Sequence, residues 1–191
     1  MEQTPDAFAA ALSSGDTDRV NRAIDTVDDM ELEERAALFD ACFKRCRDLY
    51  ESDDGYQRQS VVRFSSALYP RLAFRTVGSD LTDGALPGDW TLDELATHRR
   101  RLRDFYLDGL VDDDGRVRRA AAKALKELAL VAELIGADDE LQTMLSELET
   151  LAKDIDDETV EKHIGQAYEN VAFHAEKPGS LLPEELREAF E

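Results

Sequence analysis

The sequence predicts an all-α protein, an α-α superhelix formed by a short stack of helix pairs. Apolar residues recur at three- and four-residue spacing through most of the chain, which is typical of helices with one buried face. An acidic turn followed by such a pattern occurs three times, beginning at Asp53, Asp113 and Asp156. A turn and helix that recur in this way indicate internal repeats.

The three turns are 60 and 43 residues apart. The longer interval contains the 13-residue segment 78–90, whose three Gly and one Pro predict an exposed inserted loop. Without that loop, both intervals fit a repeat of roughly 43 residues, the length of one helix pair. We therefore expect a single domain over 1–191 that contains this irregular insertion.

The first 50 residues predict three helices. A weak hairpin over 6–12 and 17–27 suits an atypical cap at the start of a repeat array. A long helix over 31–50 follows, with Cys42 and Cys46 on or beside its apolar stripe. A zinc site would need two more Cys or His ligands, and no matching pair lies nearby. We expect reduced core cysteines.

The middle of the chain predicts two further helices. One spans 56–67 and should end or kink at Pro70. The other begins after Thr91, its capping residue, extends to Leu110 and carries the basic run 98–103. We interpret this run as a solvated face whose charges pair within the same helix, rather than as a binding patch.

The stretch Leu110–Leu125 is the clearest repeat unit. Its turn is acidic, and Asp113 or Asp114 should cap the alanine-rich helix that follows. The alanines allow another helix to approach closely. Gly165 occupies the position of Ala122 in the third copy, which predicts a second close approach. The remaining predicted helices cover 138–153, 158–175 and 183–190.

This unit strongly resembles a HEAT repeat, the helix pair of α-solenoid proteins. Asp112 and Arg118 match the Asp and Arg that link neighbouring HEAT repeats as a ladder. The resemblance covers about residues 31 to 175 and implies a right-handed stack of about four helix pairs. The other copies depart from the pattern, since Ser52 replaces the ladder Asp and Glu161 replaces the Arg. We therefore expect a short, irregular array.

The chain is strongly acidic, with 43 acidic and 23 basic residues and a net charge of −20. Abundant Asp and scarce Lys resemble proteins of salt-loving organisms, and suggest a haloarchaeal member of the family. The start of the chain has no basic segment followed by an apolar one, and no run is long enough to span a membrane. We expect a cytoplasmic protein.

No combination of residues predicts catalysis. The three histidines, His98, His163 and His174, are widely spaced, and no metal-protease, phosphate-loop or nucleophile-elbow motif is present. We expect no catalytic residue, no metal, no cofactor and no small-molecule substrate.

Basic side chains recur at equivalent positions of the three repeats. Arg63 aligns with Lys123, and Arg119 aligns with Lys162. These positions should form rows on one surface of the second helices, so the candidate binding residues are Arg63, Arg119, Lys123, Lys126 and Lys162. The alternative is that they pair with Asp and Glu of adjoining turns.

The sequence therefore favours a non-enzymatic protein-interaction scaffold that uses the inner helical surface, with another protein as its partner. The alternative function is nucleic-acid binding by a HEAT-like protein, with DNA glycosylase-like activity as one form of it. A continuously positive surface would favour nucleic acid, and an acidic or mixed surface would favour protein.

Overall fold

The computed structural model describes residues 1–69 and 92–176, and these residues form helices and short connections without any strand. The all-α prediction is confirmed. The predicted loop over 78–90 and the predicted helix over 183–190 lie outside the described residues.

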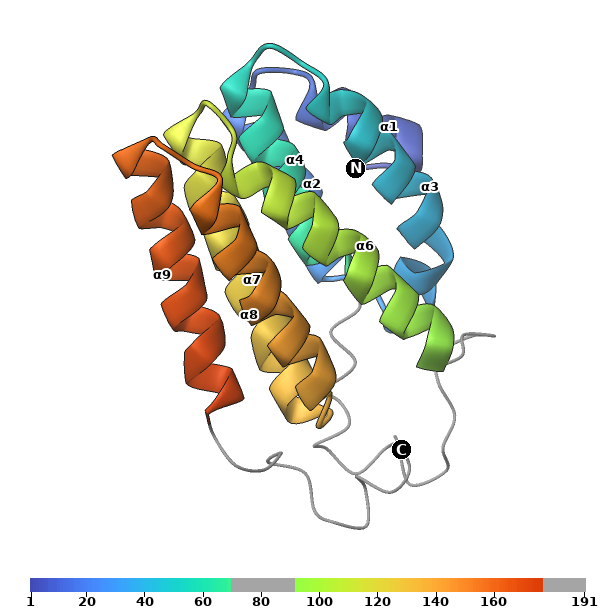
Figure 1. The fold of residues 1–191 in the computed structure, drawn as a ribbon. Coiled ribbons are helices and arrows are strands. Elements are labelled where there is room, and N and C mark those ends of the chain that lie inside the picture. The colour runs from blue at the N-terminus through green and yellow to red at the C-terminus, as the bar shows by residue number, and fades with distance from the viewer. Residues whose placement is uncertain (70–91, 177–191) are drawn as a thin grey trace.

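The described helices form four successive pairs (Figure 1). Their bounds agree with the expected ranges to within about one residue: α1 (Pro5–Leu12) and α2 (Thr17–Asp28), α3 (Leu32–Tyr50) and α4 (Gly55–Leu68), α6 (Leu92–Leu110) and α7 (Gly115–Leu134), α8 (Asp138–Lys153) and α9 (Glu158–Ala175).

The second helices of the pairs pack side by side in the order α2, α4, α7, α9, and we call this layer the second-helix row. The first helices form the other layer. There α1 packs on α3, and side chains of α6 contact both α3 and α8. This two-layer arrangement is what a stack of helix pairs requires, since each pair buries its apolar faces against the next.

Three aspartates begin the second helices at equivalent repeat positions. The carboxylates of Asp54, Asp114 and Asp157 accept hydrogen bonds from the backbone N–H two residues further on, at 2.9, 2.7 and 2.8 Å. Each satisfies a donor that the first turn of a helix leaves without a partner. The capping role expected of Asp113 or Asp114 therefore belongs to Asp114.

Arg58 and Arg118 also occupy equivalent positions and make equivalent bonds. Each donates from Nη1 to the backbone carbonyl six residues earlier, Ser52 for Arg58 at 2.8 Å and Asp112 for Arg118 at 2.6 Å. Arg58 additionally binds the carboxylate of Asp112 in the next repeat. Within 1–69 and 92–176, the buried Nε of Arg118 has no hydrogen-bond partner, because Ile155 stands where the preceding turn has Asp112.

Helix α4 ends at Leu68, and Tyr69 adopts an extended backbone with ψ 121°. The residue before a proline is pushed out of the helical region, so Pro70 ends this helix as predicted.

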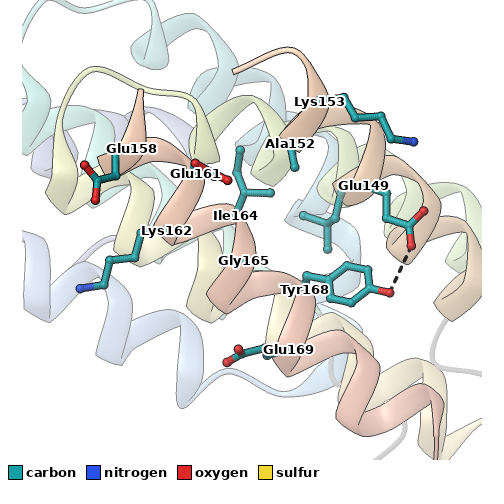
Figure 2. A pocket seen from close by; sticks show the side chains of 11 residues that line it. Glu149, Ala152, Lys153, Glu158, Glu161, Lys162, Ile164, Gly165, Tyr168 and Glu169 are labelled. Atoms are coloured by element: carbon teal, nitrogen blue, oxygen red, sulfur yellow. Dashed lines mark hydrogen bonds between the residues drawn. The ribbon is translucent and has the colours of Figure 1, made fainter. Parts of the chain in front are cut away.

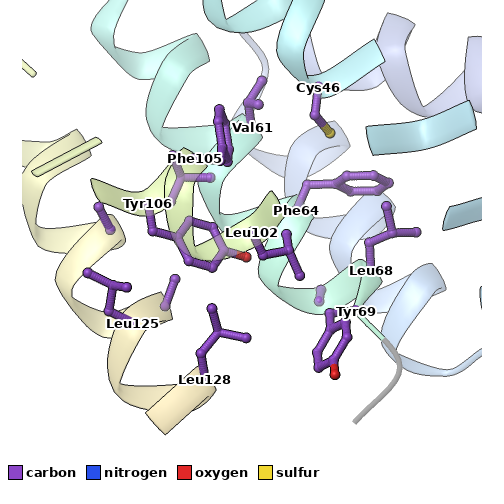
Figure 3. Close-up of a cluster of buried hydrophobic side chains, with 14 of the residues drawn as sticks. Cys46, Val61, Phe64, Leu68, Tyr69, Leu102, Phe105, Tyr106, Leu125 and Leu128 are labelled. Atoms are coloured by element: carbon purple, nitrogen blue, oxygen red, sulfur yellow. The ribbon is translucent and has the colours of Figure 1, made fainter. Parts of the chain in front are cut away.

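The core lies between the two layers and is rich in aromatic side chains (Figure 3). Phe64, Phe105 and Tyr106 are almost fully buried. Cys42 and Cys46 are buried free thiols, which confirms the core assignment. Burial raises the pKa of Cys42 to about 11.

Close approach of helices occurs at Gly109 rather than at Gly165. A Cβ added to Gly109 would lie 2.9 Å from the Cβ of Ala121, so α6 and α7 touch through small residues. A Cβ added to Gly165 would meet nothing within 4 Å. The prediction for Gly165 is wrong, because its face of α9 lies at the end of the described array and packs on no further repeat.

Candidate functional site

All five candidate binding residues are exposed on the second-helix row: Arg63 on α4, Arg119, Lys123 and Lys126 on α7, and Lys162 on α9. The structure brings Arg63 and Lys123 together. They line one crevice of about 150 Å³ between α2, α4 and α7. Arg119 and Lys126 line neither this crevice nor its neighbour, and Lys162 lines a different groove, on α8 and α9.

The crevice carries both signs of charge. Arg63 donates to the side-chain oxygen of Asn21 at 3.1 Å, and the Lys123 ammonium lies 3.9 Å from the carboxylate of Glu127. Glu127 also accepts a hydrogen bond from Ser66 at 2.6 Å, and Asp28 lies on the crevice wall. The mixed-charge crevice therefore consists of Asp28, Arg63, Ser66, Lys123 and Glu127 with small apolar neighbours.

The remaining basic residues of the row lack partners. Arg119, Lys126 and Lys162 make no ion pair with any residue in the described part of the chain. The expected alternative, pairing with carboxylates of adjoining turns, is absent for these three within 1–69 and 92–176. Their charges stay available to a ligand.

An apolar hollow of about 230 Å³ adjoins the mixed-charge crevice. It shares Ser66, Ala124 and Glu127 with that crevice, and its other walls are mainly apolar side chains with the Tyr69 and Tyr106 rings. No sequence pattern indicated this hollow, because packing alone brings Tyr106 of α6 close to Leu128 of α7.

The basic run 98–103 does not form the solvated, internally paired face that we predicted. His98 is buried with its ring 4.3 Å from that of Phe39, and burial lowers its pKa. The arginines mostly reach other helices. Arg101 binds Asp40 of α3 at 2.5 Å, while Arg99 binds Glu140 and Arg103 binds Glu147, both on α8. Within α6, Arg103 also pairs with Asp104, and Arg100 donates to the hydroxyl of Thr97 at 3.0 Å. The ion pairs of this run therefore link α6 to α3 and α8, the neighbouring first helices.

A buried polar pair joins the last turns of α7 and α9. Nδ1 of His174 lies 2.6 Å from Oε2 of Glu133, and both side chains are 6% exposed. Among the described residues, Nε2 of His174 has no hydrogen-bond partner. No sequence pattern indicated this pair, because the two residues are 41 positions apart. No third ligand is near, since the described residues contain no group of three His, Cys, Asp or Glu that could hold a metal.

None of the described helices combines the length and apolar character needed to cross a bilayer.

Comparison with known proteins adds little to this description. No family model matches the chain, and no curated protein does. A solved structure described as that of an engineered protein aligns with 91% of this chain and 62% of its own, at 18% identity and a TM-score of 0.46. This chain thus spans less than two thirds of that protein, and a likeness of this size carries no functional argument.

Proposed function

We propose that the chain is a non-enzymatic, HEAT-like scaffold that binds a segment of another protein on its second-helix row. The observation that carries the proposal is the mixed-charge crevice next to the apolar hollow, at the packed faces of α4 and α7. Such a surface can accept an apolar side chain and pair with charges of either sign beside it.

The character of the surface favours protein over nucleic acid. Glu127 and Asp28 lie among the cations of the crevice, and phosphates would be repelled by them. Nucleic-acid binding also depends on phosphate contacts, which weaken steeply as salt rises. A peptide held through apolar burial and short ion pairs depends less on ionic strength.

The test is reversal of two charges on α7. The variant Arg119→Glu, Lys123→Glu should lose proteins that the parent chain captures from a high-salt lysate, as identified by mass spectrometry. Its melting temperature should stay nearly unchanged, since both side chains are exposed. A matched control is Lys44→Glu, Arg47→Glu, which alters two exposed cations on α3, in the other layer, and changes the net charge equally.

The control variant should capture the same proteins as the parent. If the α7 variant also keeps every partner, these residues do not belong to the site. Binding of a labelled DNA duplex in molar KCl, measured by fluorescence anisotropy and lost in the α7 variant, would instead support the nucleic-acid alternative.

A further inference from the structure

A groove of about 780 Å³ runs along α8 and α9, the last helices in the described part of the chain (Figure 2). Its floor is mainly apolar and is formed by Leu148, Ala152, Ile164, Gly165 and Tyr168. At Gly165 the floor is open, since a Cβ added there would meet nothing within 4 Å. Among the described helices, α9 packs mainly on α7 and α8, so they leave this side of it uncovered.

The open side of α9 corresponds to the side of α7 on which α9 itself packs. Ala122 and Glu133 share that side of α7, because they are 11 residues and thus about three turns apart, and Glu133 contacts His174 of α9. The repeat spacing of 43 residues places Gly165 at the position of Ala122. A small residue there allows close approach, so the groove has the shape that receives a helix elsewhere in this array.

The border of the groove is acidic overall. Four carboxylates and two ammonium groups line it without an ion pair to any residue of 1–69 and 92–176: Glu149, Lys153, Glu158, Glu161, Lys162 and Glu169. An occupant with more basic than acidic side chains would gain from this excess of negative charge. A second copy of the chain, with its net charge of −20, matches such a border poorly.

One of these carboxylates is held in a position that suits an arginine. The hydroxyl of Tyr168 donates to Glu149 at 3.2 Å, the dashed line in Figure 2. The same combination is complete elsewhere in the molecule, where the carboxylate of Asp112 accepts from Tyr50 and also binds Arg58. At Glu149, no described residue supplies the guanidinium. A carboxylate with free lone pairs beside an aromatic ring can bind an arginine that a ligand brings.

We propose that the groove binds an amphipathic helix of a partner protein, with apolar side chains on the floor at Gly165 and an arginine on Glu149. This site is separate from the mixed-charge crevice, which lies between α2, α4 and α7. The lining residues of α9 extend from Glu158 to Glu169, about 16 Å along the helix, so about three turns of the partner fill the groove.

A synthetic peptide tests the proposal on the full chain. The probe has about 14 residues, is held helical by a side-chain lactam, and carries leucines at three- and four-residue spacing flanked by arginines. Fluorescence anisotropy in about 0.15 M KCl should show one-to-one binding. Glu149→Gln with Glu169→Gln should weaken this binding by about fivefold or more. The control, Glu33→Gln with Glu34→Gln, removes two exposed carboxylates of α3 and should change the affinity by less than about twofold.

Two further variants separate the shape of the groove from its charge. Gly165→Gln fills the open space and should weaken binding about tenfold without lowering the melting temperature, because glutamine is a better helix former than glycine. Tyr168→Phe keeps the floor but removes the hydroxyl that holds Glu149, so it should weaken the arginine peptide about threefold. A peptide with lysines in place of the arginines lacks the paired donors and should bind the parent and Tyr168→Phe alike.

Several results would overturn the proposal. Among them are equal affinities of the Glu149 double variant and its control, and equal binding of a peptide with glutamates in place of the arginines. Loss of peptide binding in Arg119→Glu, Lys123→Glu would place the peptide on the second-helix row instead. Dimerisation of the parent that Gly165→Gln abolishes, measured by analytical ultracentrifugation, would show that a second copy fills the groove. Failure of the peptide to bind the full chain would overturn this site alone, since the proposed function rests on the crevice.

Discussion

Arg58 of α4 donates two parallel hydrogen bonds to the carboxylate of Asp112 in the following repeat, from Nε to Oδ2 at 2.8 Å and from Nη2 to Oδ1 at 2.9 Å. The two side chains are only 11% and 6% exposed. Tyr50 donates to the same carboxylate at 2.8 Å, and the backbone N–H of Asp114 donates at 2.8 Å. This cluster joins the second and third repeats through side chains of α3, α4 and the turn before α7.

Removing either partner should destabilise the fold strongly, because the other charge would remain buried without compensation. Arg58→Ala and Asp112→Ala should each lower the free energy of unfolding by about 3 kcal/mol, measured by denaturant titration. The double variant should lose less than the sum of the two. Arg116→Ala is the control: the Arg116 side chain that pairs with Asp114 is exposed, so its removal should leave the free energy of unfolding nearly unchanged. If Arg58→Ala and Arg116→Ala lowered the free energy of unfolding by similar amounts, the buried Arg58–Asp112 pair would not have the stabilising role proposed for it.

The same cluster should make stability depend on acid. Burial alone would raise the pKa of Asp112, but hydrogen bonds from Arg58, Asp114 and Tyr50 outweigh it and hold that pKa below its ordinary value. A lowered pKa contributes stability above the carboxyl's unfolded pKa, about 3.9, which is lost as pH falls through the folded value. The melting-temperature gap between parent and Asp112→Asn should be constant above about pH 5 and narrow below about pH 4. A gap that stays constant down to pH 3 would argue against this role.

Two glycines should respond to alanine in opposite ways. A Cβ on Gly55 would overlap the carboxylate of Asp114, which caps α7, so Gly55→Ala should lower stability by about 1–3 kcal/mol. Gly165 has open space and ordinary helical geometry, so Gly165→Ala should raise stability by up to about 1 kcal/mol. Thermal melts of the two variants beside the parent measure both. A stabilising Gly55→Ala would mean that the turns are not in contact.

The thiols should be protected in the native protein. Because burial raises the pKa of Cys42 to about 11, its thiolate fraction at pH 8 falls about a hundredfold below that of a thiol with the unshifted value. Alkylation by iodoacetamide, followed by mass spectrometry, should be at least that much slower in the native state than in guanidinium. Comparable rates in the two states would place the cysteines outside the core.

Salt should strengthen the fold. With a net charge of −20, carboxylates repel one another in dilute buffer, whereas in molar salt the screening length shrinks to about 3 Å. We expect the melting temperature, followed by far-ultraviolet circular dichroism, to rise from dilute buffer to molar KCl. Sucrose at equal osmolality does not screen charge, so it should not raise the melting temperature as KCl does. Equal stability at all salt concentrations would refute the expectation.

Local chemistry explains which features could be predicted from the sequence. A capping aspartate acts within three residues of itself, so turn composition was sufficient to narrow the cap of α7 to Asp113 or Asp114. The alignment of Arg63 with Lys123 depended on the repeated turns. Placement of Arg63 beside Lys123 followed from that alignment, since equivalent positions on neighbouring helices lie close together.

Features that depend on distant partners could not be predicted. The carboxylates that Arg99 and Arg101 reach are on α8 and α3, and helical spacing within α6 says nothing about them. The Glu133–His174 pair joins two helix ends whose alignment only packing determines. The error at Gly165 has a related cause: a small residue indicates close packing only where another helix follows.

Helix α9, the last in the described part of the chain, is held differently at its two ends. The Glu133–His174 pair joins its final turn to α7, whereas Ile155 replaces the carboxylate that would bind Arg118 beside its first turn. The first turn of α9 packs through the apolar side chains of Val160 and Ile164, which are held by burial rather than by directional hydrogen bonds. The final turn therefore carries the directional polar contact between α9 and α7, and the first turn carries the apolar one.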